Sequence, residues 1–512
     1  MKRLSRLATR DWIGLGLALV GFVLRLRQYL ANRSLWLDEA MLTNNLLSRN
    51  FGGLFQQLDN NQGAPIGFLL VQKSITLLLG DSEFALRLFP LAAGALALAL
   101  MFLLVRKISN PIAGNLALGF FAIAPSLVYY SSEVKQYSSD VAITLALSLL
   151  LIRSAKSPDV APSHAPQSRG TLDSATEAVL LALAGAVAAW FSHPAFFVIG
   201  ALGLALFVPA VIAKNRQRII TLVIIAIVWI LNLGALYAIN LRQLSTHQFF
   251  LDFWRVGFMP HDPSAALTWL AYALQNPLRD LLDLQASYIV TVFLLLIGYV
   301  ALARRDSRFG FFLLAIFFLA LLASFLTLYP FAGRMILFLA PFLILFLAEG
   351  IEAIAGLFAR SKVLPWIARI LLAVYLLYSP VSVSFENFVA PKYQEHIRPT
   401  MEYLRDSRKD GDLVYVYYWA EHAVRYYAPK YGMCMCEFII GADHHENPTA
   451  YVDDLEALRG HERVWFLFSH VYENGDFNER DFILGLLDSM GEQLRQFREP
   501  GTSVYLYLYD LR

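Results

Sequence analysis

Two adjacent carboxylates, Asp38 and Glu39, lie in the stretch SLWLDEA, shortly after the first long apolar segment of the chain. Ionisable side chains are costly to place beside a lipid bilayer, and those found there commonly serve a function. A carboxylate within hydrogen-bond reach of a hydroxyl group can remove its proton while that hydroxyl attacks an electrophile. The pair therefore indicates a general base, although a helix-capping role would also account for Asp38.

Two further polar segments join apolar runs of the chain. The segment SSEVKQYSSD supplies the candidates Glu133, Lys135, Tyr137 and Asp140. The segment YPFAGR supplies Tyr329 and Arg334. Arginine can bind a phosphate through two parallel hydrogen bonds and stabilise the charge that a leaving phosphate gains. A carboxylate, such a cation and an apolar groove would be enough to transfer a group from a lipid phosphate.

Several of these candidates also have a purely structural interpretation. Glu133 could form an ion pair with Lys135 or Arg87, and Asp140 could cap the start of a helix. Arg334 could anchor its helix at the membrane surface, but it falls on the side of the membrane that basic residues tend to avoid. That position favours a contact with phosphate.

Histidines and cysteines give weaker signals. His193 precedes Pro194 at the junction of two apolar runs, where a helix end is the simpler interpretation and a polar ligand the functional one. The cluster His444-His445-Glu446 lacks the spacing of known metal motifs and is interpreted as a solvated loop. Cys434 and Cys436 are too close in sequence for unstrained disulfide geometry, so two free thiols are expected. No metal site is predicted.

The composition of the chain is that of a membrane protein. Its 512 residues are 57% hydrophobic and 16% charged, whereas soluble proteins average about 25% charged residues. The net charge of +2 gives no indication of nucleic-acid binding, and the absence of a Walker phosphate loop argues against an ATP-driven pump. A basic N-terminus without a small-residue cleavage site predicts a retained signal anchor whose basic flank is cytoplasmic.

Apolar length and basic loops together predict about eleven membrane spans. The run 66–79 is short and contains Lys73, so it is expected to be an interfacial or re-entrant helix. Every basic cluster between spans then falls inside, including the Pro/Ser-rich loop that ends near Arg169, and the three polar segments share the outer face with His193. The predicted spans are 12–30, 88–105, 111–130, 141–152, 175–191, 195–213, 219–239, 286–303, 309–329, 335–357 and 363–381.

After residue 385 the composition changes to that of a soluble domain. Strand-like runs alternate with helical patterns, which predicts a small α/β domain with a partly parallel sheet. The strands are expected at 413–419, 463–468 and 503–509, and the helices at 395–408, 421–430, 449–459 and 478–495. The predicted fold class is thus mainly α, a polytopic helical bundle with a C-terminal soluble α/β domain. The expected units are a transmembrane catalytic domain over 1–384, with outer loops 31–87 and 240–285, and an extracytoplasmic domain over 385–512.

Six segments, in this order, resemble the GT-C superfamily of multispanning glycosyltransferases, close to its family 39 group. They are LWLDEA, NNQGAPIGFLLVQK, GDSEFALRLFPLAAG, SSEVKQYSSD, SHPAFF and YPFAGRMILFLAP. With the hydrophobic layout they cover roughly residues 10–350. That group includes protein O-mannosyltransferases and lipid A aminoarabinose transferases, and some bacterial members have an outer α/β domain.

The resemblance implies a polyprenyl-phosphate-linked sugar as donor and an active site on the non-cytoplasmic face. The proposed base of the family maps onto Asp38, with Glu39 beside it, and the second acidic motif maps onto Glu133 and Asp140. Two positions depart from the family pattern. The stretch Gln62-Gly63-Ala64-Pro65 lacks the His or Lys that often precedes this proline, and Lys135 stands where Arg is common, which removes a bidentate donor.

The sequence therefore predicts an inverting glycosyltransferase of the inner or plasma membrane. Asp38 would act as the base, Glu133 would orient the acceptor or donor, and Arg334 would hold the phosphate. Glu39 is a further catalytic candidate, with the role of a second ligand or of a capping partner. The remaining candidates, all assigned to substrate binding, are Lys135, Tyr137, Asp140, His193 and Tyr329. The acceptor would be a lipid, glycan or protein, and the active site and C-terminal domain would lie on the periplasmic or extracytoplasmic side. No cofactor is assigned, and a role for a divalent metal is left open.

Two other function classes stay open on the sequence alone. A transporter or flippase of a lipid-linked saccharide would also need polar groups at membrane depth. It should show inverted repeats and polar residues near the midplane, whereas the acids here are predicted at one interface. A catalytically silent scaffold whose outer domain binds cell-envelope material is the third class.

Overall fold

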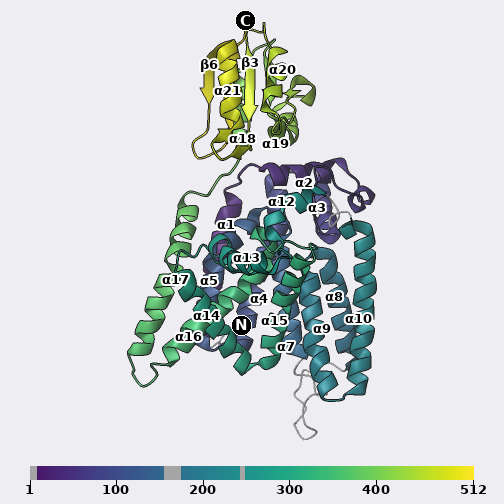
Figure 1. Ribbon diagram of the computed structural model, residues 1–512, viewed down its shortest axis with the longest axis vertical. Coiled ribbons are helices and arrows are strands. Elements are labelled where there is room, and N and C mark those ends of the chain that lie inside the picture. The colour runs from purple at the N-terminus through teal and green to yellow at the C-terminus, as the bar shows by residue number, and fades with distance from the viewer. Residues whose placement is uncertain (1–8, 155–173, 243–247) are drawn as a thin grey trace.

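The computed structural model of the protein describes residues 9–154, 174–242 and 248–512. A long helical bundle is followed by a small sheet domain, which lies beyond one end of the bundle (Figure 1). Most of the basic N-terminal flank and of the Pro/Ser-rich loop, up to Arg169, lies outside the described residues. The expectations for those two segments therefore stay predictions.

Nine helices in the described ranges are long and apolar enough to cross a membrane, which confirms the polytopic helical bundle. A tenth span is formed if the bent pair α5 (Pro111–Ile123) and α6 (Pro125–Tyr129) is counted as one. The remaining predicted span, 175–191, is occupied by the shorter apolar helix α8 (Ser174–Phe191). The nine spans are formed by α1 (Thr9–Leu30), α4 (Glu83–Ile108), α7 (Tyr137–Ser154), α9 (Ala195–Ile212), α10 (Arg216–Leu236), α14 (Tyr288–Arg305), α15 (Ser307–Phe325), α16 (Ala340–Gly356) together with the 3₁₀ segment Gly333–Leu339 before it, and α17 (Leu364–Val389).

The bend between α5 and α6 has a local cause. Pro125 lacks an N–H and disfavours helical backbone at the residue before it, so α5 ends at Ile123. The guanidinium of buried Arg25 donates to the freed carbonyls of Phe121 and Ala122, at 3.3 and 3.1 Å. The broken span is thereby fixed at the point where the chain turns toward Glu133.

The short helix α3 (Ile66–Leu79) lies beside α2 (Leu37–Ser48) at the end of the bundle nearest the sheet domain (Figure 1). Its fourteen residues extend about 21 Å, less than the roughly 30 Å of a hydrocarbon core. The ammonium group of Lys73 donates to the carbonyl of Leu46 at 2.8 Å, so it is used within the outer loop. The interfacial or re-entrant interpretation of α3 stays a prediction.

The main sheet of the domain contains five strands in the order β2-β1-β3-β7-β6, and β4 (Glu473–Asn474) and β5 (Phe477–Asn478) pair in a separate two-stranded sheet. β1 (Leu413–Val416) is parallel to β2 (Ile439–Ile440) and β3 (Val464–Phe468), and β7 (Tyr505–Asp510) is antiparallel to β3, so the partly parallel sheet is confirmed. The helices of the domain are α18 (Ile397–Ser407), α19 (Glu421–Tyr427), α20 (Tyr451–Glu456) and α21 (Glu479–Met490).

Two expectations for this domain are wrong. Helix α21 ends at Met490, and residues predicted as its last turn form the edge strand β6 (Glu492–Phe497). A side chain at Gly491 would collide with the Asp510 carbonyl, so glycine permits this close strand pairing. Cys434 and Cys436 form a disulfide instead of two free thiols, because a 3₁₀ turn brings their Cα atoms to 5.2 Å, within the normal range.

The core of the sheet domain continues into the outer loop that precedes and includes α2 and α3. Leu35, Leu42 and Phe68 from that loop belong to the same buried cluster as Ile397 and Tyr427. The bundle has a separate hydrophobic core. The outer loop therefore packs with the C-terminal domain as well as with the helices below it.

Candidate functional site

Asp38 lies in the first turn of α2 and faces two cations from distant segments. Its carboxylate forms an ion pair with the guanidinium of Arg334, and the Lys135 ammonium lies 3.9 Å from the same oxygen. The cap residue of α2 is Trp36, so the capping interpretation of Asp38 does not hold. Asp38 and Arg334 each keep 19% of their side-chain surface exposed, which leaves the pair open to a ligand.

The charge state of Asp38 follows from these neighbours. Burial by itself would raise the pKa of Asp38, but the positive charges of Lys135 and Arg334 outweigh that effect and hold it below its usual value. A hydrogen bond with the Gln62 side chain acts in the same direction. Asp38 is therefore ionised at neutral pH and can accept a proton.

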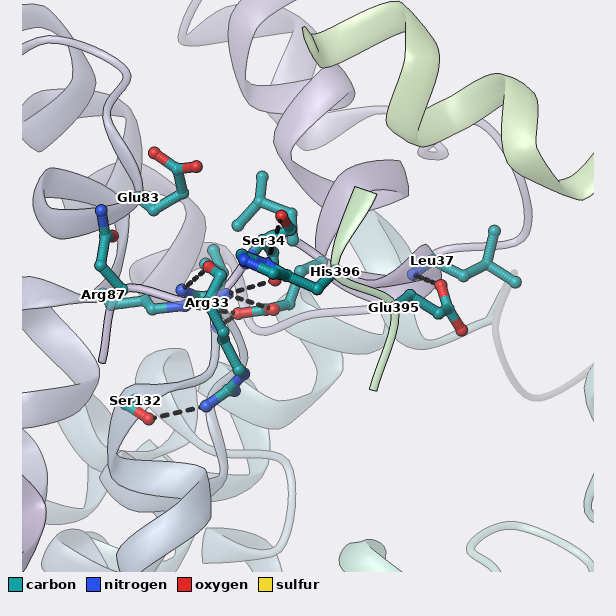
Figure 2. Close-up of polar contacts among 12 residues, drawn as sticks. Arg33, Ser34, Leu37, Glu83, Arg87, Ser132, Glu395 and His396 are labelled. Carbon is teal, nitrogen blue, oxygen red and sulfur yellow. Dashed lines mark hydrogen bonds and ion pairs between the residues drawn. The ribbon is translucent and has the colours of Figure 1, made fainter. Parts of the chain in front are cut away.

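Glu39 has a different environment from its neighbour. Its side chain is fully buried and accepts two hydrogen bonds from Arg87, at 3.0 and 2.6 Å, and a third from the Val134 N–H at 2.8 Å. Arg87 also donates to the carbonyls of Arg33 and Ser34, at 2.5 and 3.2 Å, and its position is shown in Figure 2. Glu39 thus joins α2, α4 and the loop after Glu133 and leaves no oxygen for a substrate.

Glu133 is buried, and neither of its carboxylate oxygens has a hydrogen-bond partner within the described chain. Burial and then the negative charge of Glu39 raise the pKa of Glu133 to about 7, against the lowering effects of Arg334 and Arg33. The structural ion pair with Lys135 or Arg87 is not formed. Because buried polar atoms are nearly always satisfied, this unpaired carboxylate is suited to hold a polar group of a substrate.

Lys135 is held by a residue at the position where this chain departs from the family pattern. Its ammonium donates to the side-chain amide oxygen (Oε1) of Gln62 at 2.7 Å. Burial lowers the pKa of Lys135, and the charge of Asp38 opposes that shift. Gln62 therefore accepts a hydrogen bond that directs Lys135 toward Asp38. It does not itself supply the positive charge that a His or Lys near Pro65 would supply.

Arg334 is positioned by a glycine turn and by the outer loop that follows α10. Gly333 has a φ of +50°, a conformation that favours glycine. The N–H of Phe331 donates to the carbonyl of Gly257 at 2.7 Å. Gly257 lies in the outer loop, between the short helices α12 (Gln248–Phe253) and α13 (Pro263–Asn276). The Arg334 guanidinium lies over the Trp36 ring, 5.4 Å from its centroid, and the Arg334 Nε atom is left without a hydrogen-bond partner in the part of the chain that is described.

The other candidates lie at different distances from the ion pair of Asp38 and Arg334. Tyr137 faces Arg334, with its ring centroid 5.8 Å from the guanidinium. Asp140 is buried one turn further along α7 and has one unpaired oxygen among the described atoms. The Tyr329 hydroxyl donates to the Met335 carbonyl at 2.8 Å and so braces the segment that carries Arg334.

His193 is not connected to the centre by any contact found among the described residues. It lies in the turn between α8 and α9, where burial lowers its pKa to about 4 and keeps the imidazole neutral. The structure therefore brings together Asp38, Glu133, Lys135, Tyr137 and Arg334 and leaves His193 apart.

Arg33, Trp36 and Gln62 belong to the site although sequence reasoning did not select them. Arg33 donates to the Ser132 hydroxyl at 2.9 Å, as Figure 2 shows, and lies 4.3 Å from the Tyr129 ring centroid. Its second terminal nitrogen has no hydrogen-bond partner among the described residues. The available signal was a cation on a loop predicted to be outside, where basic residues are scarce.

The arrangement combines an ionised carboxylate, an unpaired buried carboxylate and three cations at one end of a helical bundle. It can accept a proton and stabilise a phosphate that gains charge. Across the described ranges, no group of three or more His, Cys, Asp or Glu side chains could hold a metal ion.

Comparison with known proteins identifies the fold. No model of a protein family matches the sequence, and no curated protein is significantly similar to it. The structure resembles that of ArnT from Cupriavidus metallidurans bound to undecaprenyl phosphate, with 13% identity, a TM-score of 0.51 and 98% of each chain covered.

A second similar structure is the archaeal oligosaccharyltransferase AglB from Archaeoglobus fulgidus, in complex with an inhibitory peptide and a dolichol-phosphate. It has 12% identity and a TM-score of 0.51, and the alignment covers 98% of this chain and 74% of AglB. Both are GT-C superfamily enzymes. The chain therefore has the GT-C fold and is an integral membrane protein, as the sequence predicted.

Proposed function

We propose that the protein is an inverting glycosyltransferase that moves a sugar from a polyprenyl-phosphate donor to an acceptor on the non-cytoplasmic face of the membrane. The observation that carries this proposal is the open ion pair of Asp38 and Arg334 beside the unpaired, buried Glu133. The lipid phosphates bound by ArnT and AglB, undecaprenyl phosphate and a dolichol-phosphate, support the class of donor.

In the proposed reaction, an acceptor hydroxyl attacks the anomeric carbon of the donor sugar. Asp38 accepts the hydroxyl proton as the new glycosidic bond forms, and the bond between the anomeric carbon and the phosphate oxygen breaks. The polyprenyl phosphate leaves with the electron pair of that bond. A single displacement from the opposite face inverts the anomeric configuration.

Arg334 and Lys135 supply the electrostatic part of this mechanism. A donor phosphate competes with Asp38 for the Arg334 guanidinium, which frees the carboxylate to act as base and places the cation at the leaving group. Lys135 lies 3.9 Å from Asp38 and keeps it ionised during this exchange. Glu133 orients the acceptor hydroxyl or a donor hydroxyl, because its oxygens have no other partner among the described residues.

The test is a transfer assay with purified protein and a panel of radiolabelled polyprenyl-phosphate sugars. The expected result is a labelled product and free polyprenyl phosphate with one donor of the panel, and no transfer from nucleotide sugars. Lys430→Ala is the control, because Lys430 pairs with Asp81 on the surface, 3.0 Å away and outside the site. Passage of an intact lipid-linked saccharide across proteoliposomes without covalent transfer would instead support a flippase.

The proposed side of the membrane can be tested by labelling single cysteines in a background without Cys434 and Cys436. Ser48 at the end of α2 and Lys362 before α17 are suitable positions, since Ser48 is exposed near the site and Lys362 is exposed where cytoplasmic basic residues were predicted. The proposal expects Ser48→Cys to react with an impermeant maleimide from outside only, and Lys362→Cys only after permeabilisation. The reverse pattern would contradict it.

A further inference from the structure

The helix that carries Asp38 is capped by a residue from the other end of the chain. The cap residue of α2, Trp36, forms no side-chain capping bond, although the first N–H groups of a helix have no partner within the helix. The N–H of Leu37 donates instead to the Glu395 carboxylate at 2.8 Å, and Figure 2 shows the two residues side by side. Glu395 lies in the segment between α17 and α18.

Glu395 is itself fixed by the sheet domain. Its second carboxylate oxygen lies 2.5 Å from His470 Nδ1, and the side chain is buried. His470 follows strand β3 with a φ of +52°, a left-handed conformation that is unfavourable for a residue with a Cβ atom. Such strained positions persist where the surrounding structure determines them, and they concentrate at functional sites.

The His470 ring connects this cap to the ion pair of the site. It contacts Trp36 and Trp419, with ring centroids 6.3 and 4.9 Å apart. The Trp36 ring lies beneath the guanidinium of Arg334, which pairs with Asp38. Glu395 thus reaches the site by two routes, through the backbone of α2 and through the Trp36 ring.

The loop before α2 depends on the C-terminal domain along most of its length. The N–H of Ser34 donates to His396 Nδ1 at 3.2 Å, and the N–H of Leu35 donates to the Tyr427 hydroxyl at 2.8 Å. The carbonyl of Asn32 accepts from Arg398. The contact between Ser34 and His396 is drawn in Figure 2. The backbone N–H groups of Ser34, Leu35 and Leu37 therefore all donate to side chains of the C-terminal domain.

We infer that the C-terminal domain determines the geometry of the site. Glu395, held by His470, is a positioning residue that fixes α2 and therefore Asp38. The inference depends on the proposed function only for the role of Asp38. A twelve-residue helix is marginal by itself, and a carboxylate at its N-terminus satisfies an N–H and complements the helix dipole. Without Glu395 the first turn of α2 loosens and Asp38 no longer has one orientation.

The test measures hydrogen exchange of α2 in the full-length protein together with transfer kinetics. Glu395→Ala is expected to speed exchange in residues 38–42 about five- to tenfold, the range of a lost cap. It should lower kcat with little change in KM for the lipid donor. Glu395→Gln keeps an oxygen that can accept the Leu37 N–H and should stay within about twofold of wild type. Lys430→Ala, which removes a more distant contact between the same two regions, is the matched control.

A double-mutant cycle isolates the proposed bond from general destabilisation. Leu37→Pro deletes the donor N–H at the first helical position, where proline is tolerated, and the extended backbone of Trp36 suits the residue before a proline. The effect of Glu395→Ala on exchange in α2 should largely disappear in the Leu37→Pro background.

Each outcome decides one of the two claims. If Glu395→Ala leaves exchange in α2 unchanged, or has its full effect on that exchange in the Leu37→Pro background, the positioning role is wrong. If exchange responds as expected while the wild-type protein transfers no sugar from any donor, the positioning of α2 stands and the proposed function fails.

Discussion

Asp38 and Glu39 are neighbours in sequence but belong to opposite kinds of environment. Glu39 is fully buried with three hydrogen bonds and an arginine used entirely within the protein. Asp38 keeps part of its surface exposed and faces two cations that a phosphate could recruit. Successive residues of a helix point about 100° apart, so one dipeptide presents one acid to the core and the other to the site.

This difference indicates a structural role for Glu39 and a chemical role for Asp38. A buried ion pair loses several kcal/mol when one partner is removed, because the other charge is left uncompensated. A partly exposed pair can exchange partners during a reaction. The two acids are thus not a pair of equivalent catalytic carboxylates, and variants of each should fail in different assays.

The largest expected effect on stability is that of Glu39→Ala. It leaves the Arg87 guanidinium buried without a counter-charge and should lower the free energy of unfolding by about 3–5 kcal/mol. Thermal unfolding in detergent measures this loss. Asp38→Asn serves as the comparison and should change the unfolding temperature little. Equal destabilisation by both variants would remove the distinction.

Substitution of Arg334 should act on chemistry more than on folding. Lysine keeps the charge but cannot form two parallel hydrogen bonds, so Arg334→Lys is expected to lower kcat about 10- to 100-fold, and Arg334→Ala more. Steady-state transfer kinetics with the preferred donor provide the measurement. Wild-type kcat for Arg334→Lys would show that the guanidinium does not hold the leaving phosphate.

Glu133 should determine a pH dependence near neutrality. Its pKa in the folded protein is about 7, above the ordinary 4.5, so the folded state holds a proton that the unfolded state has lost over that interval. Stability should therefore fall as pH rises from about 4.5 to 7, and Glu133→Gln should abolish that slope. If the ionised carboxylate orients the substrate, kcat rises through pH 7 in wild type and is flat in Glu133→Gln. An unchanged profile in the variant would assign the inflection to another group.

The smallest effect is expected for Lys430→Ala, far from both acids. Its surface pair with Asp81 should contribute less than about 1 kcal/mol, and transfer rates should match wild type. A loss of activity here would mean that any contact between the outer loop and the C-terminal domain affects the site. Activity assays would then not distinguish the role of Asp38 from that of Glu39.

The sequence predicted the fold and the approximate gathering of the site, because both depend on apolar length and on basic loops. Those rules place Asp38, Glu133 and Arg334 at one end of the bundle, and the structure joins Asp38 to Arg334 directly. The same rules also grouped His193 with them, although it shares no described contact with the ion pair.

What the sequence could not predict depends on helix phase and on distant contacts. Which acid of the dipeptide faces Arg87 is set by how α2 packs. The acceptor role of Gln62 requires Lys135 to arrive from another loop, 73 residues away. The cap from Glu395 joins positions 358 residues apart, and no local pattern signals it.

In the proposed mechanism Asp38 acts as the base, while Glu39 stabilises the structure around it. The most direct measurement is the single-turnover rate of sugar transfer by Asp38→Asn at saturating donor, with unfolding measured on the same sample. We expect a rate lower by about 10²- to 10⁴-fold in a protein that is as stable as wild type. Transfer by Asp38→Asn at the wild-type rate would contradict it.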